Sequence, residues 1–248
     1  MEQLIYKLKS IRLSGMSQKL PVRLQEATAN ELSYQEFITN LIEDELTVRK
    51  DRLLNRRLKQ ANLPYLKTMA DFDFSFNPSI NKQHIKKLAT TAFVAQEQNV
   101  LLIGPPGVGK THLAVAWAIE AIQKGFTVVY RSIFDVAQEI AENKLDLIKN
   151  YLRPQLFILD ELGMKNLTHQ AHEIILEIIH RRYQRAATLI ATNRPIEDWG
   201  KMFGDNATAS AILDRFLENV HYIKITGKSY RLKNAKEQKN VDSEQKNP

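Results

Sequence analysis

Apolar residues recur at a helical period through the first sixty positions of the chain. They return every three to five residues from Leu4 onward, and this stretch holds no glycine after Gly15. Such spacing predicts helices that each bury one face. We therefore expect residues 1–66 to form a small all-helical domain.

The longest of these predicted helices has a clear start and a clear end. Ser33 followed by Glu36 forms a capping box, in which two side chains satisfy the free N–H groups of a first helical turn. The helical pattern then runs through Leu58, and Pro64 ends it soon afterwards. We expect the linker to the next domain at residues 61–67.

Beyond the linker, short apolar runs alternate with helical patterns. The runs that predict buried strands occupy residues 100–103, 126–130, 156–159 and 187–191. Helical patterns cover 81–97, 110–124, a stretch ending near 143, a stretch ending near 185, and much of the chain after 191. This alternation predicts an α/β domain over residues 67–232, with a parallel sheet covered by helices on both faces.

Two segments flank the predicted α/β domain. Phe72, Phe74 and Phe76 alternate with polar residues just before it, and we expect them to pack the entry segment against the domain rather than to stack on bases. Residues 233–248 are polar and rich in charge, which predicts a disordered tail.

Charge and composition narrow the range of partners. The chain of 248 residues holds 35 Lys and Arg against 28 Asp and Glu, a formal charge of +7. This excess favours a polyanionic partner such as nucleic acid or an anionic membrane surface, although simple solubility also explains it. The absence of cysteine excludes disulfides and thiolate metal sites. With neither a leader pattern nor an apolar run of about 18 residues, we expect a cytoplasmic protein with no membrane partner.

The run after the first predicted strand is suited to phosphate binding. Its glycines let backbone N–H groups converge on phosphates, and the positive end of the following helix faces them. Lys110 can neutralise the β- and γ-phosphate oxygens, and the Thr111 hydroxyl can bind Mg²⁺. The run therefore predicts an ATP site that uses Mg²⁺. It reads Gly104, Pro105, Pro106, Gly107, Val108, Gly109, Lys110 and Thr111.

The third predicted strand ends in two carboxylates. Asp160 is expected beside the Mg²⁺ ion, at the carboxyl edge of the sheet. Glu161 can orient or deprotonate a water for attack on the γ-phosphate, unless it serves only as a charge at a helix start. The pair favours a hydrolase over a small-molecule kinase.

The fourth predicted strand delivers Asn193 to the same edge. Its amide could hydrogen-bond both the γ-phosphate and the attacking water. By themselves, Thr192 and Asn193 would indicate only a turn. Because they follow the next strand after the acidic pair, a catalytic role for them is favoured. Arg194, the next residue, is either a nucleotide contact or a surface charge.

Two groups of basic residues have open interpretations. Arg215 stands in an apolar helical stretch, where a guanidinium needs a ligand, a partner or a nearby acid such as Asp214 or Glu218. A second group lies near the end of the long N-terminal helix, and it predicts contacts to DNA phosphates without base specificity, or else a solvated helix face. Its members are Arg49, Lys50, Arg52, Arg56, Arg57 and Lys59, beside a single acid, Asp51.

Taken together, these motifs resemble the AAA+ branch that contains IstB-like transposition ATPases and DnaC-like helicase loaders. The resemblance rests on the phosphate loop, Asp160-Glu161, Thr192-Asn193, the box from Leu213 to Phe216 and the run from Gly227 to Arg231. The IstB-like family is the more similar, through residues 107–114, Phe72-Asp73-Phe74, Arg182-Tyr183 and Glu197-Asp198-Trp199.

The resemblance implies roles that the residues alone do not settle. It implies a P-loop AAA+ sheet, with His112 in the nucleotide motif and Arg231 as the second-sensor arginine. It also implies that Arg215 is an arginine finger that reaches the ATP of a neighbouring subunit, so that ATP sites are shared within a homo-oligomer.

The sequence departs from the related patterns at two points. Too few residues follow Arg231 for the helical lid of most AAA+ proteins, a truncation that the IstB and DnaC branch shares. An aspartate often stands at the position of Glu161 in IstB-like proteins, and the glutamate here still supplies a general base.

Three functions follow as hypotheses. The first is an ATPase that oligomerises on duplex DNA and assists a transposase. The second is a helicase loader that holds single-stranded DNA and binds a replicative helicase. The third is an adaptor that binds ATP without hydrolysing it.

Overall fold

The computed structural model describes residues 1–78, 80–142, 148–204 and 207–233. The chain divides into two compact units, Met1–Arg57 and Leu58–Pro248. The predicted tail at 233–248 lies outside the described residues except for Lys233, and the predicted helix end near residue 143 also lies outside them. In the described part of the chain, no helix is both long and apolar enough to cross a membrane.

The first unit is helical, as predicted. It contains α1 (Glu2–Ser10), α2 (Ser14–Ala29) and most of α3 (Tyr34–Ala61), whose last turn belongs to the second unit. The capping box at the start of α3 is confirmed. The Ser33 amide donates to Glu36 Oε2 at 2.9 Å, and the Glu36 amide donates to Ser33 Oγ at 3.3 Å.

A buried carboxylate joins α2 to α3. Glu45 is 4% exposed, and its Oε2 accepts the N–H groups of Gly15 at 2.6 Å and Met16 at 3.2 Å, in the first turn of α2. The two helices meet so closely that a Cβ on Gly15 would lie 2.7 Å from the Glu45 Cα. Arg23 adds a bidentate pair with Asp44 at 2.8 and 2.9 Å. The Glu45 carboxylate therefore offsets the positive end of α2.

The second unit is built on a five-stranded parallel sheet in the order β2-β3-β4-β1-β5. Four strands match the predicted ones, with small shifts of their ends. The fifth strand was not predicted. The strands are β1 (Asn99–Ile103), β2 (Val128–Ser132), β3 (Leu156–Leu162), β4 (Ala187–Thr192) and β5 (Val220–Lys224).

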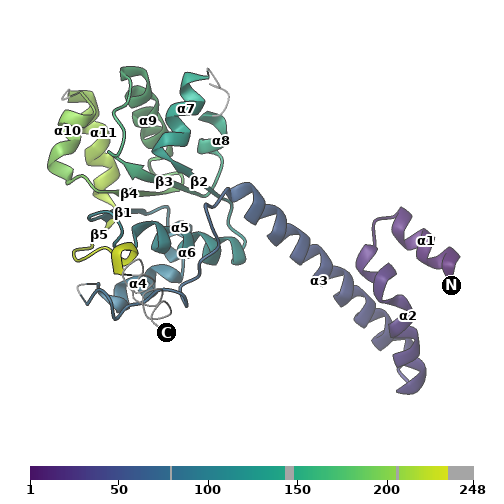
Figure 1. Cartoon of the computed structure of the whole chain (residues 1–248). Coiled ribbons are helices and arrows are strands. Elements are labelled where there is room, and N and C mark those ends of the chain that lie inside the picture. The colour runs from purple at the N-terminus through teal and green to yellow at the C-terminus, as the bar shows by residue number, and fades with distance from the viewer. Residues whose placement is uncertain (79, 143–147, 205–206, 234–248) are drawn as a thin grey trace, which may run out of the picture. The chain divides into compact units, whose positions relative to one another are not determined.

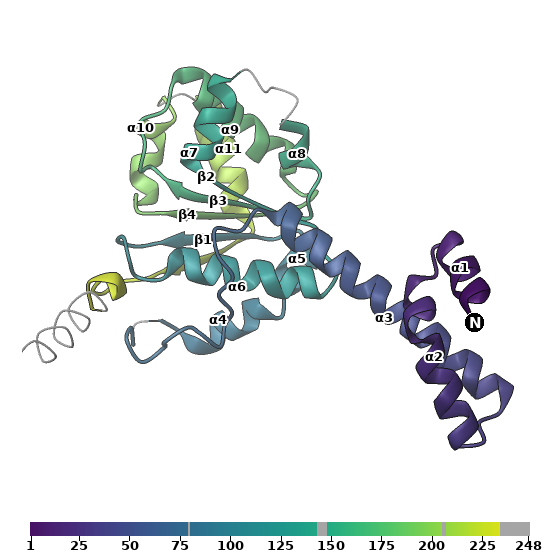
Figure 2. The ribbon, with the colours of Figure 1, turned by 45° about the vertical axis from the view of Figure 1, so that its right-hand side comes forward.

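Helices cover both faces of this sheet, as predicted (Figures 1 and 2). One face carries α4 (Lys82–Ala89), α5 (Ala92–Ala95) and α6 (Lys110–Gln123). The other carries α7 (Ile133–Ala141), α8 (Ile148–Leu152), α9 (His169–Arg182), the 3₁₀ turn η2 (Ile196–Asp198), α10 (Trp199–Met202) and α11 (Ala207–Glu218). The single helix predicted at 81–97 is two helices, because Thr91 adopts φ = 59° between them.

The register brings the strand ends to one level, which positions the functional site. Ile103 lies opposite Thr192 of β4 and Lys224 of β5, and Thr192 lies opposite Leu162 of β3. On the outer side of β3, Asp160 lies opposite Ser132. The loops that follow these strands therefore share one edge of the sheet, where ligands of open α/β sheets usually bind.

Arg182 holds the opposite edge of the sheet together. It is 2% exposed and lies at the end of α9. Its guanidinium donates to the carbonyls of Tyr151 at 2.7 Å, Pro154 at 2.9 Å and Ala187 at 2.6 Å, and to the Thr188 hydroxyl at 3.0 Å. One side chain thus supplies donors to the end of α8 and the start of β4.

Replacing Arg182 by methionine is expected to lower the free energy of unfolding by about 3 to 5 kcal/mol, because several buried acceptors lose their donor. Arg181→Met is the matched control, since the neighbouring Arg181 is exposed and pairs with Glu177 on the surface, an interaction worth about 1 kcal/mol or less. Chemical denaturation measures both. Equal losses in the two variants would contradict the role of Arg182.

Candidate functional site

The glycine-rich loop follows β1 and is closely surrounded. Gly107 and Gly109 adopt φ of 81° and 103°, which disfavour any side chain. A Cβ on Gly107 would lie 2.1 Å from Ser229 Oγ, and a Cβ on Gly109 would lie 2.8 Å from the Phe72 ring. The loop is therefore held between the entry segment before the sheet and the segment after β5.

Lys110 begins α6 directly after this loop. Its Nζ donates to the carbonyls of Gly104 at 2.7 Å and Pro105 at 2.9 Å. Burial lowers the pKa of the Lys110 amine, and the nearby Asp160 and Glu161 carboxylates act in the opposite direction. The amine thus lies between the loop and the two acids that the sequence singled out.

A cavity of about 250 Å³ opens beside the loop. Its phosphate-loop side consists of residues 107–112, which includes the predicted nucleotide residues Lys110, Thr111 and His112. The remaining walls come from the entry segment and the segment after β5. These residues are Tyr65, Lys67, Asp71, Phe72, Asp73, Phe76, Asn77, Tyr230 and Arg231.

The entry segment does more than pack against the domain. Phe72 lies edge-on to His112 at 5.2 Å, and Phe76 lies edge-on to Tyr230 at 5.0 Å, so the aromatic residues do pack against the unit. Phe72 and Phe76 also line the cavity, and the sequence did not predict this second role. No spacing signal pointed to this, because the wall forms only when the segment folds over the loop.

Two predicted nucleotide residues connect the cavity walls. His112 Nε2 lies 2.9 Å from the Thr68 carbonyl, which ties α6 to the entry segment. Arg231 lines the cavity, and its charge acts on the pKa of both Lys110 and Glu161. The adjacent Tyr230 amide donates to the Gly107 carbonyl at 2.9 Å. The segment after β5 is thereby attached to the phosphate loop.

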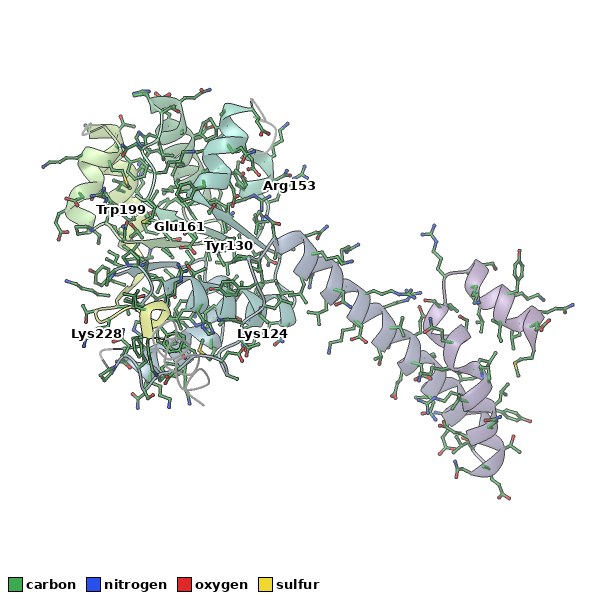
Figure 3. All side chains as sticks on the ribbon, viewed as in Figure 1. Lys124, Tyr130, Arg153, Glu161, Trp199 and Lys228 are labelled. Atoms are coloured by element: carbon green, nitrogen blue, oxygen red, sulfur yellow. The ribbon has the colours of Figure 1, made fainter. Side chains whose placement is uncertain are left out.

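Asp160 is a buried carboxylate with defined partners. It is 1% exposed, its Oδ2 accepts the Tyr130 hydroxyl at 2.9 Å, and its Oδ1 accepts the Glu161 amide at 2.7 Å. Tyr130 reaches it from the neighbouring strand β2. Burial, and then the charge of Asp160, raise the pKa of the Tyr130 hydroxyl, which remains a donor. Figure 3 labels Tyr130 and Glu161 in the middle of this unit.

Glu161 occupies an irregular point in β3. It adopts φ = 61°, and the register against β4 shifts between Leu159 and Leu162. A bulge of this kind re-aims a side chain at the end of a strand. Burial and the adjacent Asp160 raise the pKa of the Glu161 carboxyl, while Arg231 and Lys110 act to lower it. A raised pKa makes the ionised group a stronger base.

The residues around the loop fit ATP and Mg²⁺. The glycines form a cradle that a Cβ at Gly107 or Gly109 would fill. Each oxygen of Asp160 accepts one hydrogen bond and keeps lone pairs for a cation. Together with the Thr111 hydroxyl, this donor set consists of hard oxygen atoms, which Mg²⁺ prefers.

The end of β4 is tied to the end of β3. The Thr192 hydroxyl donates to the Leu162 carbonyl at 2.7 Å and accepts the Arg194 amide at 3.0 Å. Asn193 donates from Nδ2 to Met164 Sδ at 3.1 Å. Within the described residues, its Oδ1 is buried and has no hydrogen-bond partner. That oxygen is thus a buried acceptor to which no described residue donates.

Arg215 lies at the other edge of the sheet. It is exposed near the end of α11, shortly before β5, whose first residue Val220 pairs with Asn99 at the start of β1. Its Nη1 donates to His180 Nδ1 at 3.2 Å, and within the described residues it makes no ion pair with Asp214 or Glu218. A five-residue strand spans roughly 16 Å, longer than an arginine side chain. Arg215 therefore cannot reach the phosphate loop of its own chain.

The six bases predicted to contact DNA all lie on α3. Arg49 pairs with Glu45 within α3 at 2.7 Å and reaches the Arg12 carbonyl from Nη2 at 3.5 Å, and Arg52 donates to the Ser14 hydroxyl. The contacts with Arg12 and Ser14 hold α3 to the rest of the first unit. The other four are Lys50, Arg56, Arg57 and Lys59. Of these, Lys50, Arg56 and Lys59 are exposed and Arg57 is half-buried.

The fold and the loop define a P-loop ATPase of the AAA+ class. Among solved structures, the chain is similar to DnaI (TM-score 0.51, 22% identity, 66% of this chain and 89% of that one). It is also similar to AMPPCP-bound DnaA from Aquifex aeolicus (TM-score 0.54, 20% identity, 71% and 56%). At these identities, the likeness shows the fold alone.

The chain belongs to the family of IstB-like ATP-binding proteins, whose family model matches residues 6–238. A relative from Pseudomonas aeruginosa, named for insertion sequence IS21 and for ATP binding, is 37% identical over 94% of this chain and 90% of its own length. A relative from Bacillus thuringiensis subsp. berliner, named for insertion sequence IS232 and for ATP binding, is 34% identical over 94% and 95%.

Proposed function

We propose that this ATPase assembles on duplex DNA when it binds ATP and assists the transposase of an insertion sequence. The observation that carries the proposal is the position of Arg215, at the edge of the sheet away from the phosphate loop. An arginine finger placed there can complete only the site of another copy. The names of the relatives supply the insertion-sequence context.

In this proposal, residues 104–112 and Arg231 hold ATP, and Thr111 and Asp160 hold Mg²⁺. The metal ion, when bound, neutralises charge that develops on the phosphate oxygens. The loop's N–H groups and the start of α6 face the phosphates, and Lys110 adds a positive charge beside them. The aromatic residues of the entry segment exclude water from the other side of the cavity.

Hydrolysis requires a water held in line with the γ-phosphate. We assign Glu161 as the group that accepts its proton, because its carboxyl has a raised pKa and lies beside Asp160. Asn193 orients the same water through Oδ1, which has no other hydrogen-bond partner among the described residues. Arg215 of a neighbouring copy stabilises the charge of the transition state.

The α3 bases are proposed to contact DNA phosphates. Lys50, Arg56 and Lys59 are exposed, and no carboxylate within the described residues pairs with them. Such contacts carry no sequence information, so binding should be non-specific and should weaken steeply with salt. In keeping with the sequence reading, residues 1–66 are proposed as the DNA- and partner-binding domain and 67–232 as the ATPase domain, in a cytoplasmic protein.

The test compares binding of duplex and single-stranded DNA in the presence of ATP at increasing salt. The proposal predicts tighter binding to duplex and a strong salt dependence. Tighter binding to single strands would instead support the helicase-loader alternative. ATP binding without phosphate release, with or without DNA, would support the non-hydrolysing adaptor.

Tyr130→Phe tests how Asp160 is held for Mg²⁺. Without the hydroxyl, Oδ2 loses its donor and the carboxylate is free to rotate, and changes of this kind typically weaken metal binding about 10-fold or more. We expect a labelled ATP analogue to need about 10-fold more Mg²⁺ for half-maximal binding. Binding in the absence of Mg²⁺ should stay the same.

Tyr151→Phe is the matched control for this experiment. Tyr151 is 2% exposed, and within the described part of the chain its hydroxyl has no hydrogen-bond partner. Its removal should leave the Mg²⁺ titration unchanged. If Tyr130→Phe titrates like Tyr151→Phe, the hydroxyl does not position Asp160.

A further inference from the structure

A second cavity, larger than the one at the phosphate loop, lies beside the carboxyl ends of β3 and β4. Its volume is about 480 Å³. One wall is the loop between β3 and α9, and the other is the segment from Arg194 into α10. The polar side chains that line it are Lys165, Asn166, His172, Arg194, Asp198 and Lys201.

The charge of this cavity favours an anion. Among the described residues that line it, three are cationic, Lys165, Arg194 and Lys201, and Asp198 is the one acid. Lys165 extends over the Phe134 ring, with Nζ 5.8 Å from the ring centre, and it forms no ion pair with another described residue. Clustered ammonium and guanidinium groups with an amide alongside are the usual partners of phosphate oxygens.

Arg194 connects the cavity to the proposed catalytic residues through direct contacts. Arg194 directly follows Asn193, and its side chain rests on Gly163, two residues after Glu161. A Cβ on Gly163 would lie 2.4 Å from Arg194 Cγ, and Arg194 Nε lies 3.4 Å from the Gly163 carbonyl. Asn193 contacts the next residue of the same loop, Met164. A movement of Arg194 toward a ligand would therefore shift the loop that follows Glu161.

We propose that this cavity takes a backbone phosphate of DNA and that the contact between Arg194 and Gly163 transmits DNA binding to Glu161 and Asn193. The inference rests on the proposed function and deepens it, because it names the place where DNA would stimulate hydrolysis. The α3 bases would supply affinity, and the cavity would supply the coupling.

The double variant Lys165→Ala/Lys201→Ala tests the cavity. Removing the two lysines that hold this phosphate should lower the slope of log affinity against log salt by about 1. The rate of ATP hydrolysis without DNA should remain that of the wild type, and stimulation by duplex DNA should fall at least fivefold. Arg194→Met keeps both lysines, so it should bind DNA about as tightly as the double variant or more tightly. It should nevertheless lose the stimulation of ATP hydrolysis by duplex DNA.

Arg153→Ala is the matched control, since it removes one exposed charge from the same unit at the edge where β3 begins. Figure 3 labels Arg153 and Trp199, the first residue of α10, on opposite sides of this unit. Both DNA binding and stimulation should be unchanged in this variant. Thermal melting of all variants verifies that each is folded.

The outcomes separate the two proposals. If the wild type neither binds duplex DNA nor is stimulated by it, the proposed function fails. If the wild type does both and the double variant matches it in salt slope and stimulation, only the cavity proposal fails. A cavity that holds an acidic protein segment instead of DNA would give this result. If inorganic phosphate alone stimulates the wild type as DNA does, the ligand is free phosphate and the assignment to DNA is overturned.

Discussion

Arg215→Ala is expected to lower ATP hydrolysis by about 10³- to 10⁵-fold while leaving ATP affinity unchanged, because an arginine finger acts on the transition state of a neighbouring site. The side chain lies too far from the phosphate loop of its own chain to contribute to ATP binding there. Phosphate release and binding of a labelled ATP analogue measure the two effects separately. Arg185→Ala, which removes an exposed arginine from the same edge of the sheet, is the control.

A mixing experiment shows whether the finger acts between chains. Arg215→Ala supplies an intact phosphate loop and Glu161, and Glu161→Gln supplies an intact Arg215. Mixed assemblies should contain some sites with both groups, so activity should return above that of either variant alone. An inactive mixture that still assembles would place Arg215 in a role within one chain, such as its contact with His180.

Glu161→Gln is expected to lower the rate of hydrolysis by about 10²- to 10⁴-fold, the usual contribution of a general base. Glutamine keeps the size and shape of the side chain and has no carboxylate to accept a proton, so ATP should still bind and hold the assembly together. We expect ATP-bound complexes to persist on DNA. Single-turnover hydrolysis and the lifetime of the complexes are the measurements.

The control for this change is Glu173→Gln, because the Glu173 side chain is 67% exposed on α9 and lies beside His169. Its hydrolysis rate should equal that of the wild type. Turnover by Glu161→Gln within a few-fold of the wild type would mean that another group accepts the proton.

The arrangement of the candidate site could be predicted from the sequence because the residues that form it follow local patterns. The phosphate loop lies within eight consecutive residues, and its conformation depends on glycines at fixed positions. Asp160, Glu161 and Asn193 follow apolar runs directly, and parallel strands bring such ends to one edge. Short-range patterns were therefore enough to place these residues together.

Contacts between distant segments could not be predicted in the same way. Tyr130 contacts Asp160 only because β2 lies beside β3, and the sequences of these two strands do not determine the strand order. Arg182 looks like the basic end of an amphipathic helix, and its buried acceptors come from two other segments. The entry segment forms a wall of the nucleotide cavity only after it folds over the loop.

The strand β5 was missed for a different reason. Its residues, Val220 to Lys224, include a histidine and a lysine, and only Ile223 is buried. An edge strand that is half exposed gives neither a continuous apolar run nor a strong alternation. It nevertheless matters for the site, because it leads the chain to Ser229, Tyr230 and Arg231 beside the phosphate loop.

The most direct test of shared ATP sites is the mass of the protein on duplex DNA with ATP, with ADP and without nucleotide, measured at saturating protein. The account predicts large complexes on duplex DNA that form with ATP and dissociate with ADP. Arg215 would then face the ATP of an adjacent copy within each complex. A protein that stays monomeric on duplex DNA with ATP bound would contradict the account.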